Sequence, residues 1–199
     1  MVQMFKLFFV YSLLAALVGC AAMGVPVTSD PAKKLGYAGS LYDQQGRPIP
    51  AERLIQEAIE IYEEQQNELG LAEAYRQYAF FFRSASVRKH EEYYRSVGFR
   101  DKSATFDSRY LKSIEYFEKA RDLYMGHEKH DGLMNVYLNM GFTYQLMDTP
   151  KAACPVFDKS LSSYNEYLKS HPDANLQVPS GFSSFEDYIY EVKRSGSCQ

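Results

Sequence analysis

The feature that most constrains the fold of this chain is a recurring spacing of bulky and small side chains. Its clearest copy begins with Tyr137, Met140, Gly141 and Tyr144, at i, i+3, i+4 and i+7. This spacing places the four side chains on one face of a helix. Thr149-Pro150 then ends that helix and starts another, because proline lacks the N–H that a helix interior needs but suits a first turn. The second helix carries a stripe of its own: Ala153, Phe157 and Ser160.

Two earlier stretches repeat this spacing, one without a gap and one with an insertion. The first stretch consists of Leu35, Ala38, Gly39 and Tyr42, followed by Ala51, Ile55 and Ala58. The second consists of Tyr75, Tyr78, Ala79 and Phe82, followed after 22 additional residues by Ser113, Phe117 and Ala120. Three stripes with matched spacing predict three helical hairpins stacked in an array, with small residues where paired helices approach closely.

Two further sets of residues support this alignment. A tyrosine recurs near the end of each second helix, at Tyr62, Tyr124 and Tyr164. Gly70 and Gly132 occupy equivalent places in the linkers that follow the first two of these helices. At a helix end we expect such glycines to adopt the left-handed conformation that other residues resist.

The pattern resembles the tetratricopeptide repeat (TPR), in which Trp, Leu-Gly and Tyr line the first helix and Ala and Phe line the second. Three identities depart from it, since Tyr137 replaces Trp, Met140 replaces Leu and Ser160 replaces a usual Ala. The resemblance implies an all-α fold in which three TPR-like helical hairpins form a right-handed superhelix over residues 32–175. Asp30-Pro31 is expected to cap and open the first helix.

A C-terminal helix over residues 180–194 is expected to cap the last hairpin, which otherwise leaves a hydrophobic face bare. Its apolar face consists of Phe185, Tyr188, Ile189 and Val192. Ser184 with Asp187 is a helix-start signal for it.

The N-terminus carries an export signal. Lys6 precedes an apolar run from Leu7 to Val18, which is too short to span a bilayer and typical of a signal peptide. The run ends in Leu17-Val18-Gly19-Cys20, which resembles the bacterial lipobox. The resemblance implies a signal peptide over residues 1–19, acyl chains such as palmitate on Cys20, and a tether over residues 20–31. The alternative is a plain secretory signal cut near Ala22.

Ala21-Ala22, with no Asp after the cysteine, resembles the pattern of lipoproteins sent to the outer membrane. We therefore expect a lipid-anchored protein on its periplasmic face. In that oxidising compartment Cys154 and Cys198 are candidates for a disulfide, and the alternative is that Cys154 is a small buried residue.

The insertion lies in the middle repeat, over about residues 84–106. We expect its part from Val87 to Tyr94 to be helical and to extend the first helix of that repeat, with loop around Gly98. Insertions in such arrays emerge on one face and often carry the binding function, so Tyr93 and Tyr94 are candidate contacts. The alternative is that they pack, with Phe99, onto a neighbouring helix.

The first helices supply the other candidate surface. The resemblance implies that they line a groove holding partner segments. The candidate contacts are Arg76, Phe80 and Arg83 of the middle repeat and Asn135, Leu138, Phe142 and Gln145 of the last. Since Phe82 is needed for the core, Phe80 points about 160° away around the helix and is expected to be an exposed anchor. The alternative is that the insertion or the C-terminal helix covers Phe80 and Phe142.

Several function classes are disfavoured. A net charge of −3 and a pI near 5.8 provide no basic field for nucleic acid. The sequence contains no glycine-rich phosphate loop and no Gly-x-Ser-x-Gly motif, and its histidines lack the partners of a zinc site. We therefore predict no catalytic residues, no metal, no cofactor and no small-molecule substrate.

These observations predict a lipid-anchored, all-helical scaffold or adaptor that binds a protein partner in the cell envelope. One alternative is an immunity or inhibitor lipoprotein that neutralises a toxic envelope enzyme through the insertion. Another is an accessory lipoprotein for assembly of a pilus, a secretion system or the outer membrane.

Overall fold

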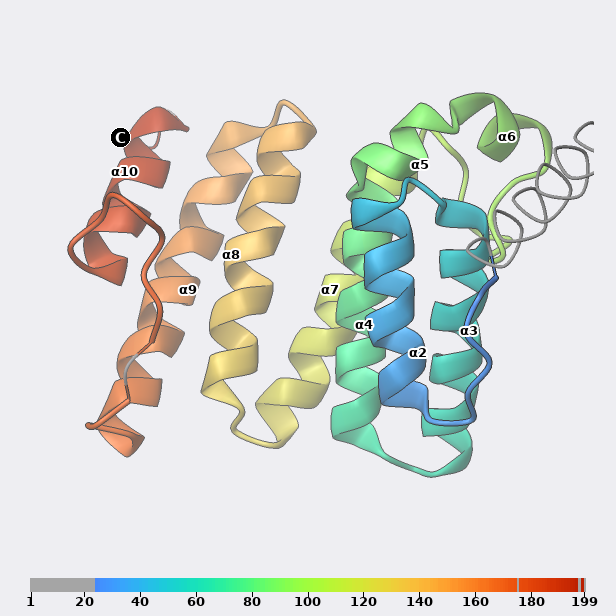
Figure 1. The fold of residues 1–199 in the computed structure, drawn as a ribbon. Coiled ribbons are helices and arrows are strands. Elements are labelled where there is room, and N and C mark those ends of the chain that lie inside the picture. Colours follow the sequence, from blue (N-terminus) through green and yellow to red (C-terminus); the bar gives the residue numbers. More distant parts are fainter. Residues whose placement is uncertain (1–23, 175, 197, 199) are drawn as a thin grey trace, which may run out of the picture.

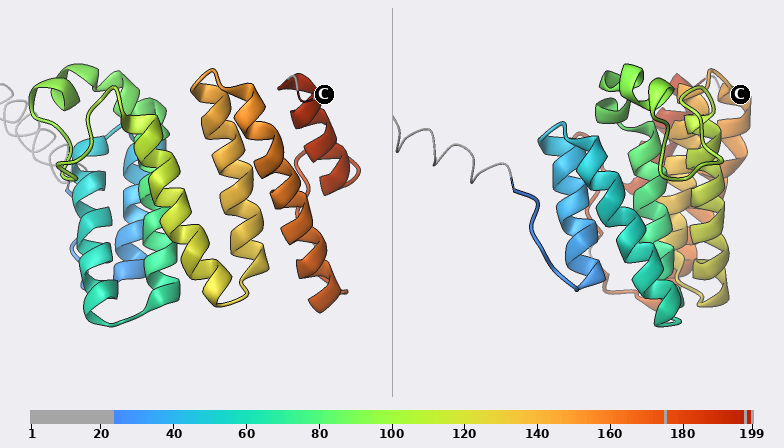
Figure 2. Two further views of the ribbon diagram at one scale, coloured as in Figure 1. Left: turned by 180° about the vertical axis from the view of Figure 1, so that it is seen from behind. Right: turned by 90° about the vertical axis from the view of Figure 1, so that its right-hand side faces the viewer.

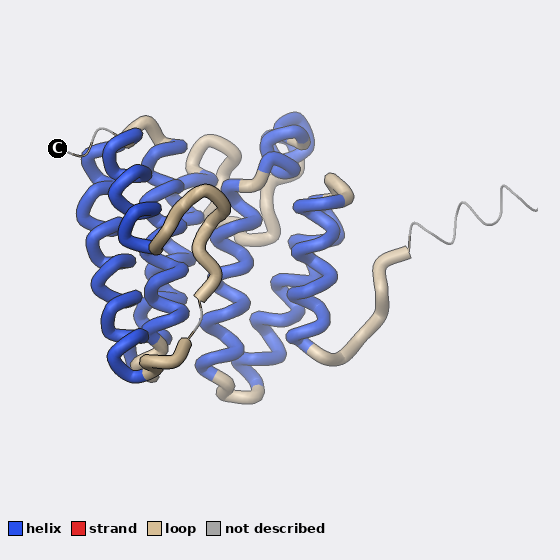
Figure 3. Tube along the Cα trace, turned by 60° about the vertical axis from the view of Figure 1, so that its left-hand side comes forward, coloured by secondary structure: helices blue, strands red, loops and turns tan. Residues whose placement is uncertain are grey.

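The computed structural model describes residues 24–174, 176–196 and 198 of the chain. Within these residues the regular secondary structure is helical and contains no strand (Figures 1 and 3), which confirms the all-α prediction. The elements are α2 (Pro31–Gly39), the π-helix η1 (Ser40–Gln44), α3 (Pro48–Glu64), α4 (Glu68–Arg83), α5 (Ala85–Lys89), α6 (Glu91–Ser96), α7 (Arg109–Gly126), α8 (His130–Leu146), α9 (Pro150–Ser170) and α10 (Phe185–Ser195).

The long helices pack as successive pairs. The helix α2 with η1 packs on α3, α4 on α7, and α8 on α9. Each pair contacts the next through α3 with α4 and α7 with α8, while α10 packs on α9, so the pairs stand side by side in one row (Figure 2). One hydrophobic cluster joins the first two pairs and extends to α8, and a second cluster joins α8, α9 and α10.

Local signals set the helix ends. The Asp30 side chain accepts hydrogen bonds from the backbone N–H groups of Ala32 and Lys33, at 2.9 and 3.2 Å, and Pro31 occupies the first helical position. At α10 the Ser184 hydroxyl accepts from the Asp187 backbone N–H at 3.1 Å. Both starts were expected, because such side chains satisfy N–H groups that have no partner within the helix.

The small residues of the stripes differ in how closely a neighbour approaches them. A Cβ atom added to Gly141 would lie 2.3 Å from a ring carbon of Phe157 in α9. The carbonyl of Ala79 accepts a hydrogen bond from the Ser113 hydroxyl of α7 at 2.8 Å. Gly39 has only the side-chain nitrogen of Gln77 nearby, 4.0 Å from such a Cβ. Close helix approach therefore requires the glycine at position 141 but not at position 39.

The linker glycines make room for the recurring tyrosines. A Cβ on Gly70 would lie 2.3 Å from the ring of Tyr62, and one on Gly132 would lie 2.8 Å from the ring of Tyr124. In the last pair Tyr164 instead packs on Phe185 of α10, with ring centroids 4.7 Å apart. Each tyrosine thus joins the end of one second helix to the start of the next element.

The prediction that these glycines adopt the left-handed conformation was wrong. Gly70 and Gly132 lie inside the first turns of α4 and α8. The residues with positive φ in the same linkers are Gln66 and Glu128, each at 51°. The chain reverses one turn earlier than expected, so the glycines are needed for space rather than for backbone freedom.

The insertion forms two short helices rather than an extension of α4. Ser84 has an extended backbone, with ψ of 150°, and its hydroxyl accepts from the Val87 N–H at 3.2 Å. This ends α4 and caps α5, and α6 follows after His90. The short helix α5 packs on η1, so the insertion covers one end of the first two pairs (Figure 1).

Candidate functional site

Two arginines of α4 lie on either side of Phe80. The guanidinium carbons of Arg76 and Arg83 are 5.6 and 5.0 Å from the centre of its ring. The same ring packs edge-to-face on Phe117 of α7, with centroids 5.3 Å apart. Phe80 is half-buried. Phe80 therefore lies between the two arginines and the core residue Phe117, which Arg83 also approaches at 5.7 Å, and the expectation of an exposed aromatic anchor is corrected.

The two arginines differ in how their charges are balanced. The Arg76 Nη2 atom lies 2.5 Å from a carboxylate oxygen of Glu73. Arg83 donates to the backbone carbonyl and the side-chain oxygen of Asn139, at 3.2 and 2.5 Å. Burial lowers the pKa of Arg83 to about 10, so the guanidinium is still charged at neutral pH. Among the described residues no carboxylate lies within 4.0 Å of it.

A pocket of about 360 Å³ lies beside Arg83. It joins η1, α4 and α8, and its lining residues are Tyr42, Asp43, Phe80, Arg83, Ser84 and Leu146. Leu146 is 49% exposed. The Tyr42 hydroxyl donates to Gln77 at 2.9 Å, and burial raises the pKa of Tyr42 to about 12. The pocket thus combines the neutral phenol of Tyr42, the apolar carbon surface of Phe80 and Leu146, the cation of Arg83 and the carboxylate of Asp43.

The candidate residues of α8 separate into two groups. Asn135 accepts a hydrogen bond from Arg76 at 3.1 Å, which ties α8 to α4. Leu138 and Phe142 pack against the second hydrophobic cluster, where Phe142 meets Phe157 edge-to-face at 5.6 Å. Gln145 lies against the end of α10, since a Cβ on Gly196 would be 2.5 Å from its side-chain nitrogen. The part of α8 nearest the pocket is therefore Leu146, which the sequence analysis did not select.

The insertion buries one of its two candidate tyrosines. Tyr94 is 1% exposed and stacks on Phe99 at 4.3 Å. Tyr93 is half-buried and packs edge-to-face on Tyr94 at 5.2 Å. The structure therefore removes Tyr94 from the candidate contact surface, and the surface of the insertion includes Val97, which is 58% exposed.

A buried carboxylate that sequence reasoning missed holds the insertion in place. Glu52 of α3 is 3% exposed and accepts from the Tyr78 hydroxyl at 2.8 Å and from the Arg100 N–H at 2.7 Å. Nearby, Tyr116 donates to Asp101 at 3.1 Å. A signal was present in the sequence, because Glu52 precedes Ile55 by three residues and Ile59 by seven and so shares their face of the helix.

Glu52 is expected to make stability depend on pH. Burial raises the pKa of Glu52, so its folded-state pKa lies above its unfolded-state value. The contribution of Glu52 to the free energy of unfolding is fully present below about pH 4, near the ordinary pKa of a glutamate. It is lost as the pH rises through the raised pKa of the folded state. Glu52→Gln keeps an oxygen acceptor for Tyr78 and Arg100 but cannot ionise. As the pH rises from about 4 to 8, the free energy of unfolding of the Glu52→Gln variant should therefore fall less than that of the wild type.

Urea unfolding at several pH values measures this difference. Glu92→Gln is the control, because Glu92 is exposed on α6 and should leave the wild-type pH profile unchanged. Parallel profiles for wild type and Glu52→Gln would contradict the assignment.

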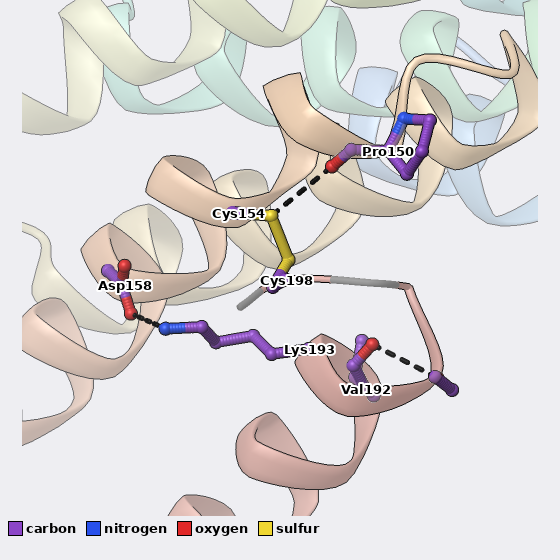
Figure 4. The surroundings of a disulfide bond; sticks show 7 residues. Pro150, Cys154, Asp158, Val192, Lys193 and Cys198 are labelled. Carbon is purple, nitrogen blue, oxygen red and sulfur yellow. Dashed lines mark hydrogen bonds and ion pairs between the residues drawn. A yellow bond between two sulfur atoms is a disulfide. The ribbon is translucent and has the colours of Figure 1, made fainter.

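A disulfide joins Cys154 of α9 to Cys198, with Cα atoms 5.5 Å apart (Figure 4). The ion pair between Lys193 and Asp158, at 2.5 Å, lies beside it. These two links fasten the C-terminal segment to α9 and hold α10 over the last pair.

Among the described residues no cluster of His, Cys, Asp and Glu suitable for a metal ion occurs. In the same part of the chain, no helix has the length and apolar character needed to cross a membrane. Cys20, the expected lipidation site, lies outside the described residues. A scan against protein-family models finds no match, and a search of curated proteins finds no relative.

Proposed function

We propose that this chain is a lipid-anchored scaffold or adaptor on the periplasmic face of the outer membrane, which binds a segment of a partner protein along its first helices. The proposal includes three TPR-like hairpins in a right-handed superhelix, an insertion in the middle repeat and α10 as the cap. The paired packing of the helices and the tyrosine contacts at successive junctions support the repeat assignment. The lipobox-like sequence before Cys20 supports the anchor.

The observation that carries the proposal is the pocket that joins η1, α4 and α8. These elements belong to three different pairs, so a segment lying there touches all three of them. The pocket offers the exposed Leu146 and the charged Arg83, and a binding surface needs both an apolar contact and a polar group that fixes orientation.

The proposed mechanism is capture rather than catalysis. Acyl chains on Cys20 would confine the protein to the membrane surface, which raises its effective concentration for any partner in the same membrane. The hydrogen bond from Arg76 to Asn135 joins α4 to α8 and so helps to keep these two first helices in a fixed arrangement before binding. A preformed surface loses less conformational entropy when the partner arrives.

A second candidate function uses the insertion. In an immunity or inhibitor lipoprotein, the insertion would contact a toxic enzyme. Two observations favour this hypothesis. Val97 is exposed, and a pocket of about 320 Å³ in the same region is lined by residues that include Val97, Arg100 and Lys102.

Three matched substitutions distinguish these readings. Leu146→Asp places a charge beside the pocket, Val97→Asp changes the insertion, and Leu111→Asp is a control on α7, where Leu111 is 60% exposed. The proposal predicts that Leu146→Asp reduces the partner protein recovered after crosslinking in cells by about tenfold, because a charge on an apolar contact costs roughly 1–3 kcal/mol. Val97→Asp and Leu111→Asp should have little effect. Loss of recovery with Val97→Asp alone would favour the insertion instead.

A further inference from the structure

We infer that the pocket beside Arg83 receives the carboxylate of an aspartate or glutamate side chain, flanked by apolar residues, in the partner segment. This inference rests on the proposed function and names the chemistry that the same surface recognises.

The unbalanced charge of Arg83 is the first argument. Arg76 and Arg83 lie against the same ring, but only Arg76 has a carboxylate partner, Glu73 at 2.5 Å. A half-buried cation without a counter-ion is costly for folding, since desolvation is not repaid by an ion pair. The rings of Phe80 and Phe117 and the oxygens of Asn139 hold the guanidinium in place between α4 and α8, but none of these groups carries a negative charge. An anion bound in the pocket would neutralise the charge.

The hydrogen bonds of Arg83 are the second argument. A guanidinium has five N–H donors in a planar fork that fits a carboxylate. Arg83 uses its Nη1 and Nη2 atoms to donate to Asn139, which fixes the plane of the group. Two hydrogen bonds leave further donors on the same fork, and Arg83 lines the pocket. Asn139 thus positions a cation whose remaining donors are available to a ligand.

The walls of the pocket are the third argument, and they favour an internal acidic residue over a chain terminus. Phe80 lies on α4 and Leu146 on α8, so two helices contribute carbon surface to the pocket that Arg83 lines. An internal acidic residue places an apolar neighbour on each side of its carboxylate, whereas a terminal carboxylate has a neighbour on one side only.

Asp43 contributes the opposite charge on another part of the wall. Asp43 is exposed. Asp43 and Arg83 form no ion pair within 4.0 Å, so the carboxylate does not neutralise the guanidinium. Asp43 should therefore repel a bound carboxylate. Removing the charge of Asp43 is therefore expected to raise the affinity of the pocket for a carboxylate.

Titration of the ¹⁵N-labelled protein with short peptides tests the inference by NMR. The probes are acetyl-Gly-Leu-Glu-Leu-Gly-amide, its Gln analogue, and the Gln analogue with a free C-terminal carboxylate. The reporter is the side-chain Nε–Hε signal of Arg83, assigned by its absence from Arg83→Met. We expect a saturable shift with the Glu peptide, and about tenfold weaker binding of both Gln peptides, since a charge-assisted pair is lost. Asp43→Asn should bind the Glu peptide more tightly.

Three results would overturn the inference. Equal binding of the Glu and Gln amides would show that the carboxylate is not read. Binding of only the peptide with the free terminus would assign the pocket to a chain end. An unchanged affinity of Arg83→Met for the Glu peptide, measured through backbone amide signals, would remove Arg83 from the site.

A cellular readout separates this failure from failure of the proposed function. If Arg83→Met still captures its partner in cells while Leu146→Asp does not, the groove binds a partner but does not select an acid. If the Leu146→Asp variant also captures its partner normally, the partner does not bind at this pocket and the proposed function fails.

Discussion

Gly141→Ala should lower the free energy of unfolding by about 1–3 kcal/mol, the usual cost of overpacking a core. The added methyl would lie 2.3 Å from a ring carbon of Phe157, which is fully buried. The loss should appear even though alanine favours a helix more than glycine does.

Gly36→Ala is the matched control for this prediction. Gly36 also lies within a helix, α2, but a Cβ there meets no atom within 4 Å. The control should therefore raise the free energy of unfolding by about 0.5–1 kcal/mol. Urea unfolding followed by circular dichroism measures both variants. Equal effects of the two substitutions would contradict the close packing of α8 on α9.

Removing the disulfide with Cys154→Ser and Cys198→Ser should lower the free energy of unfolding by about 2–4 kcal/mol. The bond closes a loop with a sequence separation of 44, and a crosslink restricts the unfolded chain more as the loop grows. The release of α10 should also expose Phe185 and Ile189, which the second cluster buries.

The wild type in reductant is the control, and it should unfold like the double variant. Titration of thiols in the unfolded mature protein without reductant provides an independent check. Two free thiols there would show that Cys154 and Cys198 do not pair.

The helices were predictable because their signals are local. Tyr137, Gly141 and Tyr144 lie within eight residues of one another, and the spacing alone specifies a helical face. Asp30 likewise caps α2 through bonds to residues two and three positions away. Such features require no knowledge of the tertiary structure.

The features that were missed depend on contacts between distant parts of the chain. Glu52 meets the backbone of Arg100 across a sequence separation of 48 residues, and nothing near Glu52 reveals that partner. The sequence left open whether Tyr94 is a surface contact or packs on a neighbouring helix, and its contact with Phe81 of α4 decides for packing.

The candidate site was only partly predictable for the same reason. Helical geometry correctly places Phe80 away from Phe82, but it does not reveal that Phe117 lies beneath the Phe80 ring. The ion pair of Arg76 with Glu73 is local, because the two residues lie three apart on α4, but the hydrogen bonds of Arg83 to Asn139 join residues 56 positions apart.

Site-specific photocrosslinking in intact cells tests the central claim most directly. A benzophenone amino acid is placed at position 146 on α8, 97 on the insertion or 111 on α7, all exposed aliphatic positions. Capture of a partner along the first helices predicts one discrete crosslinked protein at position 146 and none at position 111. A crosslink at position 97 or 111 with none at position 146 would contradict it.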